Sequence, residues 1–311
     1  MAVLVLTQPQ PSEPFLEAFA RLAPHETVYA DLEIARRAAD DIEAIVLWRL
    51  NPGVLGPFRS LRMLCASAAG VDKILACPDR APNLPVTRTV DDAQNQQIAQ
   101  YVVMMVLRHV RGLVGLEKQA LARAWRRQPI PAPAAVRIGL LGLGQSGQAV
   151  ARALLPLGFT VLGHSRRPRP VDGVQVYSGP DGLQQMLAQT QVLVCLLPLT
   201  PDTTGLIDAR LLAQMPRGAY VINVARGDLL VEPDLIAAIG SGQLAGAALD
   251  VQAREPLPAE DPLWDDPRVL VTPHIASLPH PDTVVRQVIE NLGRARSGAP
   301  LLRQVDPTQG Y

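Results

Sequence analysis

The chain of 311 residues is poor in aromatic side chains, with four Phe, five Tyr and three Trp, so its cores must be built from Leu, Val, Ile and Ala. It also has only three cysteines, Cys65, Cys77 and Cys195, whose spacing fits neither a disulfide framework nor a zinc site. No run of about 18 apolar residues is free of charge, so no transmembrane span is expected. The apolar run at residues 2–6 is too short for a signal peptide and lacks a basic flank. These absences favour a protein of the reducing cytoplasm that holds no metal.

A net charge is missing as well, because 29 Lys and Arg balance 29 Asp and Glu. The balance excludes a general attraction to nucleic acid or to an anionic membrane. Apolar residues make up 48% and charged residues 19%, which excludes wholesale disorder. The length exceeds what one hydrophobic core usually fills, so two domains are expected. The expected partner is a small molecule and not a nucleic acid or a membrane.

The first hundred residues alternate short apolar runs with helical or turn-rich stretches, which indicates a small α/β unit. The expected elements are residues 2–7, 13–23, 44–50, 61–66 and 85–89. A single long helix is expected next, from about Asp92 to Ala124, with Asp91 and Gln94 spaced as a capping box. Its apolar stretch 101–107 predicts that it is buried. A Pro-rich segment at 128–133 ends it.

From Val136 onward the alternation of strand and helix is cleaner, and it predicts a doubly wound parallel sheet. Strands are expected at 136–141, 159–163, 192–197, 220–224, 245–251 and 269–272, and helices at 146–157, 181–189, 208–215 and 232–239. A final helix at about 281–296 could return the chain to the first domain. We therefore expect two Rossmann-like domains: a flavodoxin-like domain at 1–100, completed by 278–311, and a dinucleotide-binding domain at 101–277.

A glycine-rich loop lies between the first strand and the first helix of the second domain, and its sequence fits G-x-G-x-x-G. The residues expected at a cofactor pyrophosphate are Gly142, Gly144, Gln145, Ser146 and Gly147. The first glycine permits the turn, the second lets backbone N–H groups approach the anion, and the third lets helix and strand pack closely. The helix N-terminus favours the negative charge. An ordinary turn between strand and helix is the alternative.

The second strand of that domain ends without the carboxylate that selects NAD. Ser165, Arg166 and Arg167 stand there instead, with Arg169 nearby. Guanidinium groups suit the 2′-phosphate of NADP, so NADPH is the expected cofactor. A solvated basic loop is the alternative.

Three polar residues follow later strands, where ligands bind in open α/β sheets: Arg226, Glu255 and His274. Hydride delivery to a carbonyl needs a fixed cation and a proton donor that titrates near neutrality, which Arg226 and His274 would supply. Glu255 could orient the imidazole and favour its protonated form. Each residue alone could equally be a salt-bridge partner, a loop carboxylate or a capping histidine. His280 is the only rival histidine, and we interpret it as a residue at a helix start.

Together these segments resemble the motifs of the D-isomer-specific 2-hydroxyacid dehydrogenases, from about Val46 to the C-terminus. Further similar segments are 47–48, 68–72, 262–264, 304–306 and Gly310-Tyr311. The resemblance implies reduction of small 2-oxo acids such as glyoxylate and hydroxypyruvate. It implies that Arg226 binds the substrate, that His274 is the acid/base and that Glu255 pairs with it.

The same resemblance implies further contacts. The backbone at Ala69, Gly70 and Val71 would receive the substrate carboxylate, with Trp48 beside it, because successive N–H groups form an anion nest. The remaining residues placed at the cofactor are Leu197, Pro198, Val224, Ala225, Asp250 and His274. A homodimer through the long helix and the loop after it is also implied.

Some positions depart from the family pattern or have no assigned role. Gln100 stands where many members carry Glu. Three further residues, Trp48, Arg49 and Trp125, are candidates for limiting the size of the substrate, but they could equally be ordinary packing or surface residues. A dehydrogenase for a bulkier 2-oxo acid, phosphite or formate is a second possibility. A non-catalytic nucleotide-sensing protein is a third, although Arg226, Glu255 and His274 argue against it.

Overall fold

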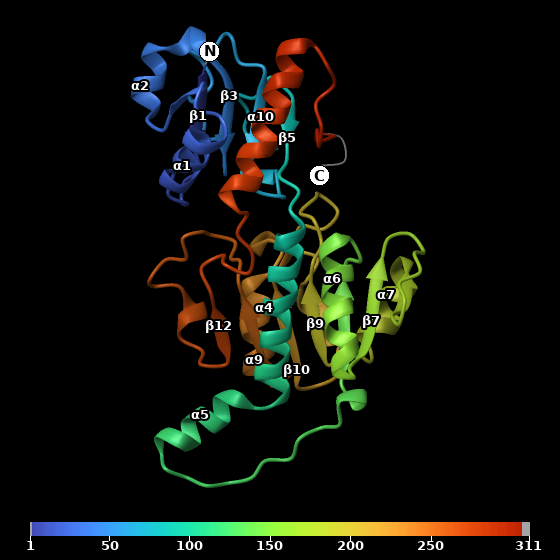
Figure 1. Ribbon diagram of the computed structural model, residues 1–311. Coiled ribbons are helices and arrows are strands. Elements are labelled where there is room, and N and C mark those ends of the chain that lie inside the picture. The colour runs from blue at the N-terminus through green and yellow to red at the C-terminus, as the bar shows by residue number, and fades with distance from the viewer. Residues whose placement is uncertain (1, 307–311) are drawn as a thin grey trace. The chain divides into compact units, whose positions relative to one another are not determined.

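The computed structural model describes residues 2–306, and the chain divides into two compact units (Figure 1). Unit 1 comprises Met1–Ala93 and Leu278–Tyr311, and unit 2 comprises Gln94–Ser277. Residues 94–100 therefore group with unit 2, whereas the sequence pattern placed them in the first domain. The physical reason is that they open a helix whose buried side chains, beginning with Ala99, belong to the core of unit 2. Gly310 and Tyr311 lie outside the described residues.

Unit 1 is built on a five-stranded parallel sheet with the order β2-β1-β3-β4-β5. The strands are β1 (Ala2–Leu6), β2 (Thr27–Tyr29), β3 (Ile42–Leu47), β4 (Met63–Ala66) and β5 (Val86–Thr87). The helices are α1 (Glu13–Leu22), α2 (Leu32–Arg37), α3 (Asp72–Leu75) and α10 (Pro281–Ser297), with a 3₁₀ turn at Ala39–Asp41. This strand order is the flavodoxin-like one, as expected.

Helices cover both faces of this sheet, and α10 comes from the far end of the sequence. Phe15 and Phe19 of α1 share one core with Val284 and Val288 of α10. The opposite face packs against α2 and α3, which contribute Ala35 and Ile74. The inner strands β1, β3 and β4 are buried on both faces, so they are apolar throughout except for buried Glu43 in β3.

Unit 2 carries a seven-stranded parallel sheet with the order β12-β11-β10-β9-β6-β7-β8. The strands are β6 (Arg137–Leu141), β7 (Thr160–Ser165), β8 (Gln175–Ser178), β9 (Val192–Cys195), β10 (Ala219–Asn223), β11 (Leu244–Leu249) and β12 (Val269–Val271). The helices are α4 (Asp92–Val110), α5 (Leu113–Leu121), α6 (Gln145–Leu154), α7 (Gly179–Leu187), α8 (Ala209–Ala213) and α9 (Glu232–Gly240). Short 3₁₀ turns lie at Pro133–Ala135, Leu155–Leu157, Gly227–Leu229 and Pro262–Trp264.

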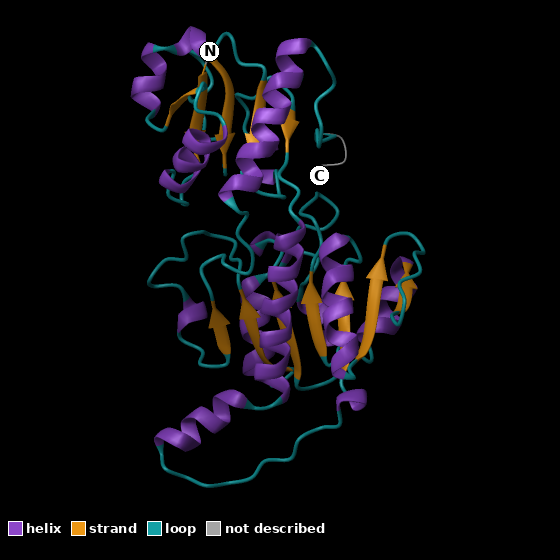
Figure 2. Ribbon diagram, viewed as in Figure 1, coloured by secondary structure: helices purple, strands orange, loops and turns teal. Residues whose placement is uncertain are grey.

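The sheet of unit 2 is doubly wound, which confirms the expected fold class. Helices α4 and α6 pack on one face, in front of the strands in Figure 2, and α7, α8 and α9 pack on the other. The strand order reverses between β6 and β9, and this is the switch point at which such sheets bind ligands.

The single helix expected at 92–124 is wrong, because the chain forms two helices. Gly112 adopts a left-handed conformation, with φ of 61°, which ends α4 and redirects the chain into α5. No residue of α5 is buried, so the expected burial holds only for part of α4. Asp91 Oδ1 accepts a hydrogen bond from Ala93 N, but Gln94 Oε1 is buried without a partner among residues 2–306, so the capping box is not formed.

Two strands escaped the sequence pattern. Strands β2 and β8 lie at sheet edges and contain no buried residue, so they lack the apolar run that marks the inner strands. The three cysteines are free and buried. None of the described helices is both long and apolar enough to cross a membrane.

Candidate active site

Three neighbouring strands of unit 2, β10, β11 and β12, deliver Arg226, Glu255 and His274 to one edge of the sheet. The pairing continues past the strand ends, since Asp250 N donates to Asn223 O at 3.0 Å and Thr272 N donates to Leu249 O at 2.9 Å. The three loops therefore start from a fixed common edge. The strand order therefore places Arg226, Glu255 and His274 after three neighbouring strands, as the sequence pattern predicts.

His274 and Glu255 are in direct contact. His274 Nδ1 lies 3.1 Å from both Oε1 and Oε2 of Glu255, and the two side chains are 20% and 16% exposed. Because Nδ1 faces the carboxylate, the ring presents its other nitrogen, Nε2, on the opposite side. A carboxylate in this position fixes the ring orientation and stabilises an imidazolium.

The loop that carries Glu255 is itself held by a second carboxylate. Ala253 N donates to Glu232 Oε1 at 2.8 Å, and burial raises the pKa of Glu232 above its ordinary value. A Cβ on Gly227 would lie 1.9 Å from the carbonyl carbon of Gln252, so the loops after β10 and β11 touch through a glycine. This close approach brings the backbone segment that carries Arg226 against the segment that carries Glu255.

Arg226 depends on the buried amide of Asn223, the last residue of β10. Asn223 Nδ2 donates to Arg226 O at 2.8 Å, and Asn223 Oδ1 accepts from Ala225 N at 3.1 Å. The Arg226 guanidinium donates to Ala225 O at 2.6 Å. The Asn223 side chain therefore fixes the backbone turn that carries the Arg226 guanidinium.

Asp250, which we placed at the cofactor, is 1% exposed and uses its carboxylate within the protein. It accepts from Thr272 Oγ1 at 2.6 Å, from Ile275 N at 2.9 Å and from Ala276 N at 2.8 Å. These bonds hold the segment around His274. Asp250 therefore fixes the backbone that follows His274.

The glycine loop has the geometry that a dinucleotide requires. Gly142 has φ of 103°, and a Cβ on Gly147 would lie 2.1 Å from Gly142 O, so neither position has room for a side chain. A Cβ on Gly144 would meet no atom within 4 Å, which leaves open space before the N-terminus of α6. Gln145 is exposed, and Ser146 Oγ donates to Asn95 Oδ1 at 2.8 Å. Backbone N–H groups at this open helix end fit a pyrophosphate.

Strand β7 ends at Ser165, with no carboxylate beside it. Ser165 Oγ donates to Arg167 O at 2.7 Å, which shapes the turn, and Arg166, Arg167 and Arg169 are exposed. The other residues placed at the cofactor follow β9 and β10. They are half-buried Leu197, exposed Pro198, and buried Val224 and Ala225.

The residues expected to receive a substrate carboxylate lie in unit 1. Trp48 and Arg49 follow β3 and are half-buried, while Ala69 and Gly70 follow β4 and are exposed and half-buried, respectively. Val71 is buried, and its carbonyl accepts from Leu75 N at 2.9 Å. All of them lie at the carboxyl ends of strands.

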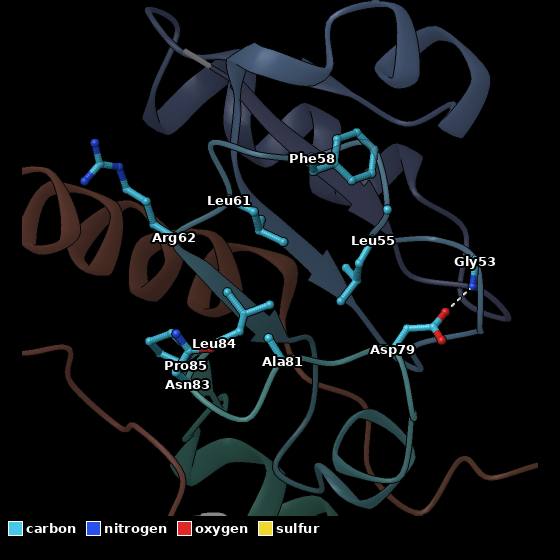
Figure 3. Close-up of a pocket in the computed structure, with 11 residues that line it drawn as sticks. Gly53, Leu55, Phe58, Leu61, Arg62, Asp79, Ala81, Asn83, Leu84 and Pro85 are labelled. Atoms are coloured by element: carbon cyan, nitrogen blue, oxygen red, sulfur yellow. Dashed lines mark hydrogen bonds between the residues drawn. The ribbon is translucent and has the colours of Figure 1, made fainter.

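A pocket of about 560 Å³ opens elsewhere in unit 1, at the amino ends of β4 and β5. Leu55, Leu61 and Leu84 point into it, the Arg62 guanidinium points away, and Gly53 N donates to Asp79 at its edge (Figure 3). Because it lies at the strand ends opposite to Trp48 and Ala69, it is separate from the expected substrate residues.

Residues 103–276 match the family described as D-isomer specific 2-hydroxyacid dehydrogenase, NAD binding domain. The chain therefore belongs to the D-isomer specific 2-hydroxyacid dehydrogenases, a family of enzymes, as the sequence motifs indicated.

Within this family the chain is similar to proteins named glyoxylate/hydroxypyruvate reductase A. The one from Yersinia enterocolitica is 38% identical over 271 residues, which cover 86% of this chain and 87% of the relative. The one from Klebsiella pneumoniae is 41% identical over 260 residues, which cover 81% and 83%.

Solved structures agree with this placement. The NADPH-dependent glyoxylate/hydroxypyruvate reductase of Sinorhizobium meliloti, in complex with NADP and sulfate, superposes with a TM-score of 0.92 and 35% identity over the full length of both chains. A probable 2-hydroxyacid dehydrogenase of Rhizobium etli, in complex with NADP, HEPES and L(+)-tartaric acid, gives 0.87 and 32% over 100% of this chain and 99% of the other.

Proposed function

We propose that this protein is an NADPH-dependent reductase of small 2-oxo acids, which converts glyoxylate to glycolate and hydroxypyruvate to D-glycerate. The observation that carries the proposal is the contact between His274 and Glu255. These residues follow β12 and β11, at the same carboxyl end of the sheet as the glycine loop that follows β6. The relatives named glyoxylate/hydroxypyruvate reductase A and the NADP complexes of similar structures support the substrate class and the cofactor.

The cofactor supplies a hydride to the carbonyl carbon, and the protein supplies the proton and the charge. His274 donates its Nε2 proton to the carbonyl oxygen while Glu255 stabilises the imidazolium from the Nδ1 side. Arg226 binds the substrate carboxylate and the developing negative charge. Within unit 1, the successive backbone N–H groups of Ala69, Gly70 and Val71 can bind a carboxylate.

The residues present fit NADP better than NAD. The open space at Gly144 and the N-terminus of α6 suit the pyrophosphate. Ser165, Arg166 and Arg167 suit a 2′-phosphate, and they offer no carboxylate to bind the free ribose hydroxyl of NAD.

A substrate panel tests the proposal. We expect fast oxidation of NADPH with glyoxylate and hydroxypyruvate, slower oxidation with pyruvate and phenylpyruvate, and weak use of NADH. A best rate with phenylpyruvate would indicate a dehydrogenase for bulkier acids. Binding of NADPH without turnover on any acid would instead indicate a nucleotide-sensing protein.

His274→Asn tests the proton donor. Asn cannot supply a proton near neutral pH, so kcat should fall by roughly 10²- to 10⁴-fold. The affinity for NADPH, measured by fluorescence titration, should change little because the hydride donor is bound mainly through its phosphates. Unchanged turnover in this variant would contradict the assignment.

A further inference from the structure

His274 has an unusual backbone conformation. Its φ is 56°, a left-handed value that a residue with a Cβ rarely adopts. Such a conformation persists only where the surroundings hold it. The groups that hold it therefore determine where the imidazole lies.

Asp250 supplies most of that support. Its backbone carbonyl accepts from His274 N at 2.9 Å, and its two carboxylate oxygens accept from Ile275 N at 2.9 Å and from Ala276 N at 2.8 Å. One buried residue thus binds three consecutive N–H groups. Any rotation of the Asp250 side chain would release two of them.

Thr272 and Tyr101 fix that side chain. Thr272 Oγ1 lies 2.6 Å from Asp250 Oδ1, and Tyr101 Oη lies 2.8 Å from Thr272 Oγ1. A carboxylate only accepts, so the Thr272 hydroxyl must donate to Asp250. Its oxygen is then left to accept, and Tyr101 must be the donor. The direction of both bonds is settled by this chemistry.

We propose that Tyr101 and Thr272 are positioning residues for His274, which act through the hydrogen-bonded chain Tyr101–Thr272–Asp250. The inference rests on the proposed role of His274 as proton donor. Tyr101 comes from α4, is 6% exposed, and is packed in the core of unit 2, so its hydroxyl has a fixed anchor. Burial raises the pKa of Tyr101 to about 12, so the hydroxyl remains a donor at any working pH.

Tyr101→Phe and Thr272→Val test the chain, and Thr272→Ser is the rescue variant because it restores the hydroxyl. Tyr220→Phe is the matched control, since Tyr220 is also buried in this core, 4% exposed, but lies near the amino end of β10. We expect Tyr101→Phe and Thr272→Val to lower kcat by about 10- to 100-fold, as a misplaced catalytic group does. The KM for NADPH should stay within about twofold, and Thr272→Ser and Tyr220→Phe should resemble the wild type.

The NMR signals of the His274 ring give a second readout that needs no turnover. We would follow them by ¹H–¹⁵N NMR in the full-length protein and assign them with His274→Asn. Because Nδ1 lies against Glu255, a ring that is held less well there should show altered ring ¹⁵N chemical shifts in Tyr101→Phe and Thr272→Val. This measurement tests the positioning even if the wild type reduces none of the acids in the panel.

Two outcomes would overturn the proposal. In the first, Tyr101→Phe keeps the kcat and the His274 ring chemical shifts of the wild type. In the second, Tyr101→Phe lowers the melting temperature alone and the pH profile of kcat/KM does not move, which is the result of a purely structural role. If Thr272→Val does not fold, Tyr101→Phe still decides between these outcomes.

Discussion

The residues at the end of β7 separate two cofactors that differ by one phosphate. Ser165 shapes the turn through its bond to Arg167 O, and Arg166 is exposed beside it. A charge-assisted contact to the 2′-phosphate contributes about 1.5–3 kcal/mol, a preference of roughly tenfold to a hundredfold for NADPH. Replacing Ser165 with Asp and Arg166 with Gln should therefore reverse the preference in kcat/KM.

The reversal should appear mainly in KM, because the phosphate lies far from the reacting carbon and is bound equally in ground and transition states. Steady-state kinetics with NADPH and NADH measure it. Arg152→Gln, on α6, is the control for a general loss of positive charge. If the double variant still prefers NADPH, the arginines are an ordinary solvated loop.

At the residue scale, the sequence could predict that three polar residues follow neighbouring strands but not which groups hold them in place. Arg226, Glu255 and His274 follow strands, and strands are readable as apolar runs. Tyr101 and Thr272 are 171 positions apart, so no local pattern could pair them. Asn223 gives the one available signal, since an amide at the end of a buried strand must find partners.

At the scale of elements, the glycine loop assigns different tasks to its glycines. A Cβ on Gly147 would lie 2.1 Å from Gly142 O, a backbone atom that cannot move without opening the contact of α6 with β6. A Cβ on Gly144 would enter open space. Gly147→Ala should thus destabilise the fold by more than about 1 kcal/mol, whereas Gly144→Ala should leave stability unchanged and weaken NADPH binding.

Urea unfolding and fluorescence titration of the two variants separate these effects. The assignment of Gly144 to the cofactor fails if Gly144→Ala binds NADPH as tightly as the wild type. The assignment of Gly147 to packing fails if its Ala variant unfolds at the same urea concentration as the wild type.

The contact between α4 and β10 predicts a dependence of stability on pH. His109 stacks on Tyr220 with ring centroids 4.2 Å apart, and burial lowers the pKa of His109 to about 4. In the unfolded chain a histidine titrates near 6.5, so between these values the unfolded state binds more protons. Stability should be complete above about pH 6.5 and should fall as the pH drops toward 4, by at most about 3 kcal/mol.

His109→Phe keeps a flat ring against Tyr220 but cannot be protonated. Its free energy of unfolding should therefore fall less than that of the wild type between pH 7 and pH 4.5, as urea unfolding would measure. His25→Gln removes an exposed histidine and should leave the wild-type dependence intact. Equal slopes for His109→Phe and the wild type would contradict the effect.

Element boundaries show where sequence patterns are weakest. The apolar pattern after Asp92 continues through Gly112, so it predicted one helix where the structure has α4 and α5. A glycine is tolerated inside many helices, and the sequence alone does not say that this one adopts a positive φ. Edge strands such as β8 are equally hidden, because one partner strand and partial burial require no apolar run.

On the scale of the whole molecule, the alternation of strands and helices was enough to predict two α/β units. The sequence pattern predicted a helix beyond the last strand, and this helix, α10, belongs to unit 1. Its packing beside α1 depends on contacts between residues at opposite ends of the sequence, which a local pattern does not show. The alternation of strands and helices does not explain why unit 2 exposes large apolar residues such as Leu121 and Trp125.

The exposed apolar side chains of unit 2 predict an assembly of two chains. Helix α5 and the segment after it extend away from the seven-stranded sheet (Figure 1), and Leu121 and Trp125 are 87% and 94% exposed. Large apolar side chains gathered on such a surface mark an association site, so we expect a homodimer through this arm. Light scattering should give twice the 33.5 kDa of one chain. Replacing Leu121 and Trp125 with Glu should give the mass of a single chain, because two charges would be buried without partners. Ile34→Glu, on α2 and 52% exposed, is the control and should leave the mass unchanged. A wild type with the mass of one chain at every concentration, or a double variant that keeps the doubled mass, would show that the arm does not mediate dimerisation.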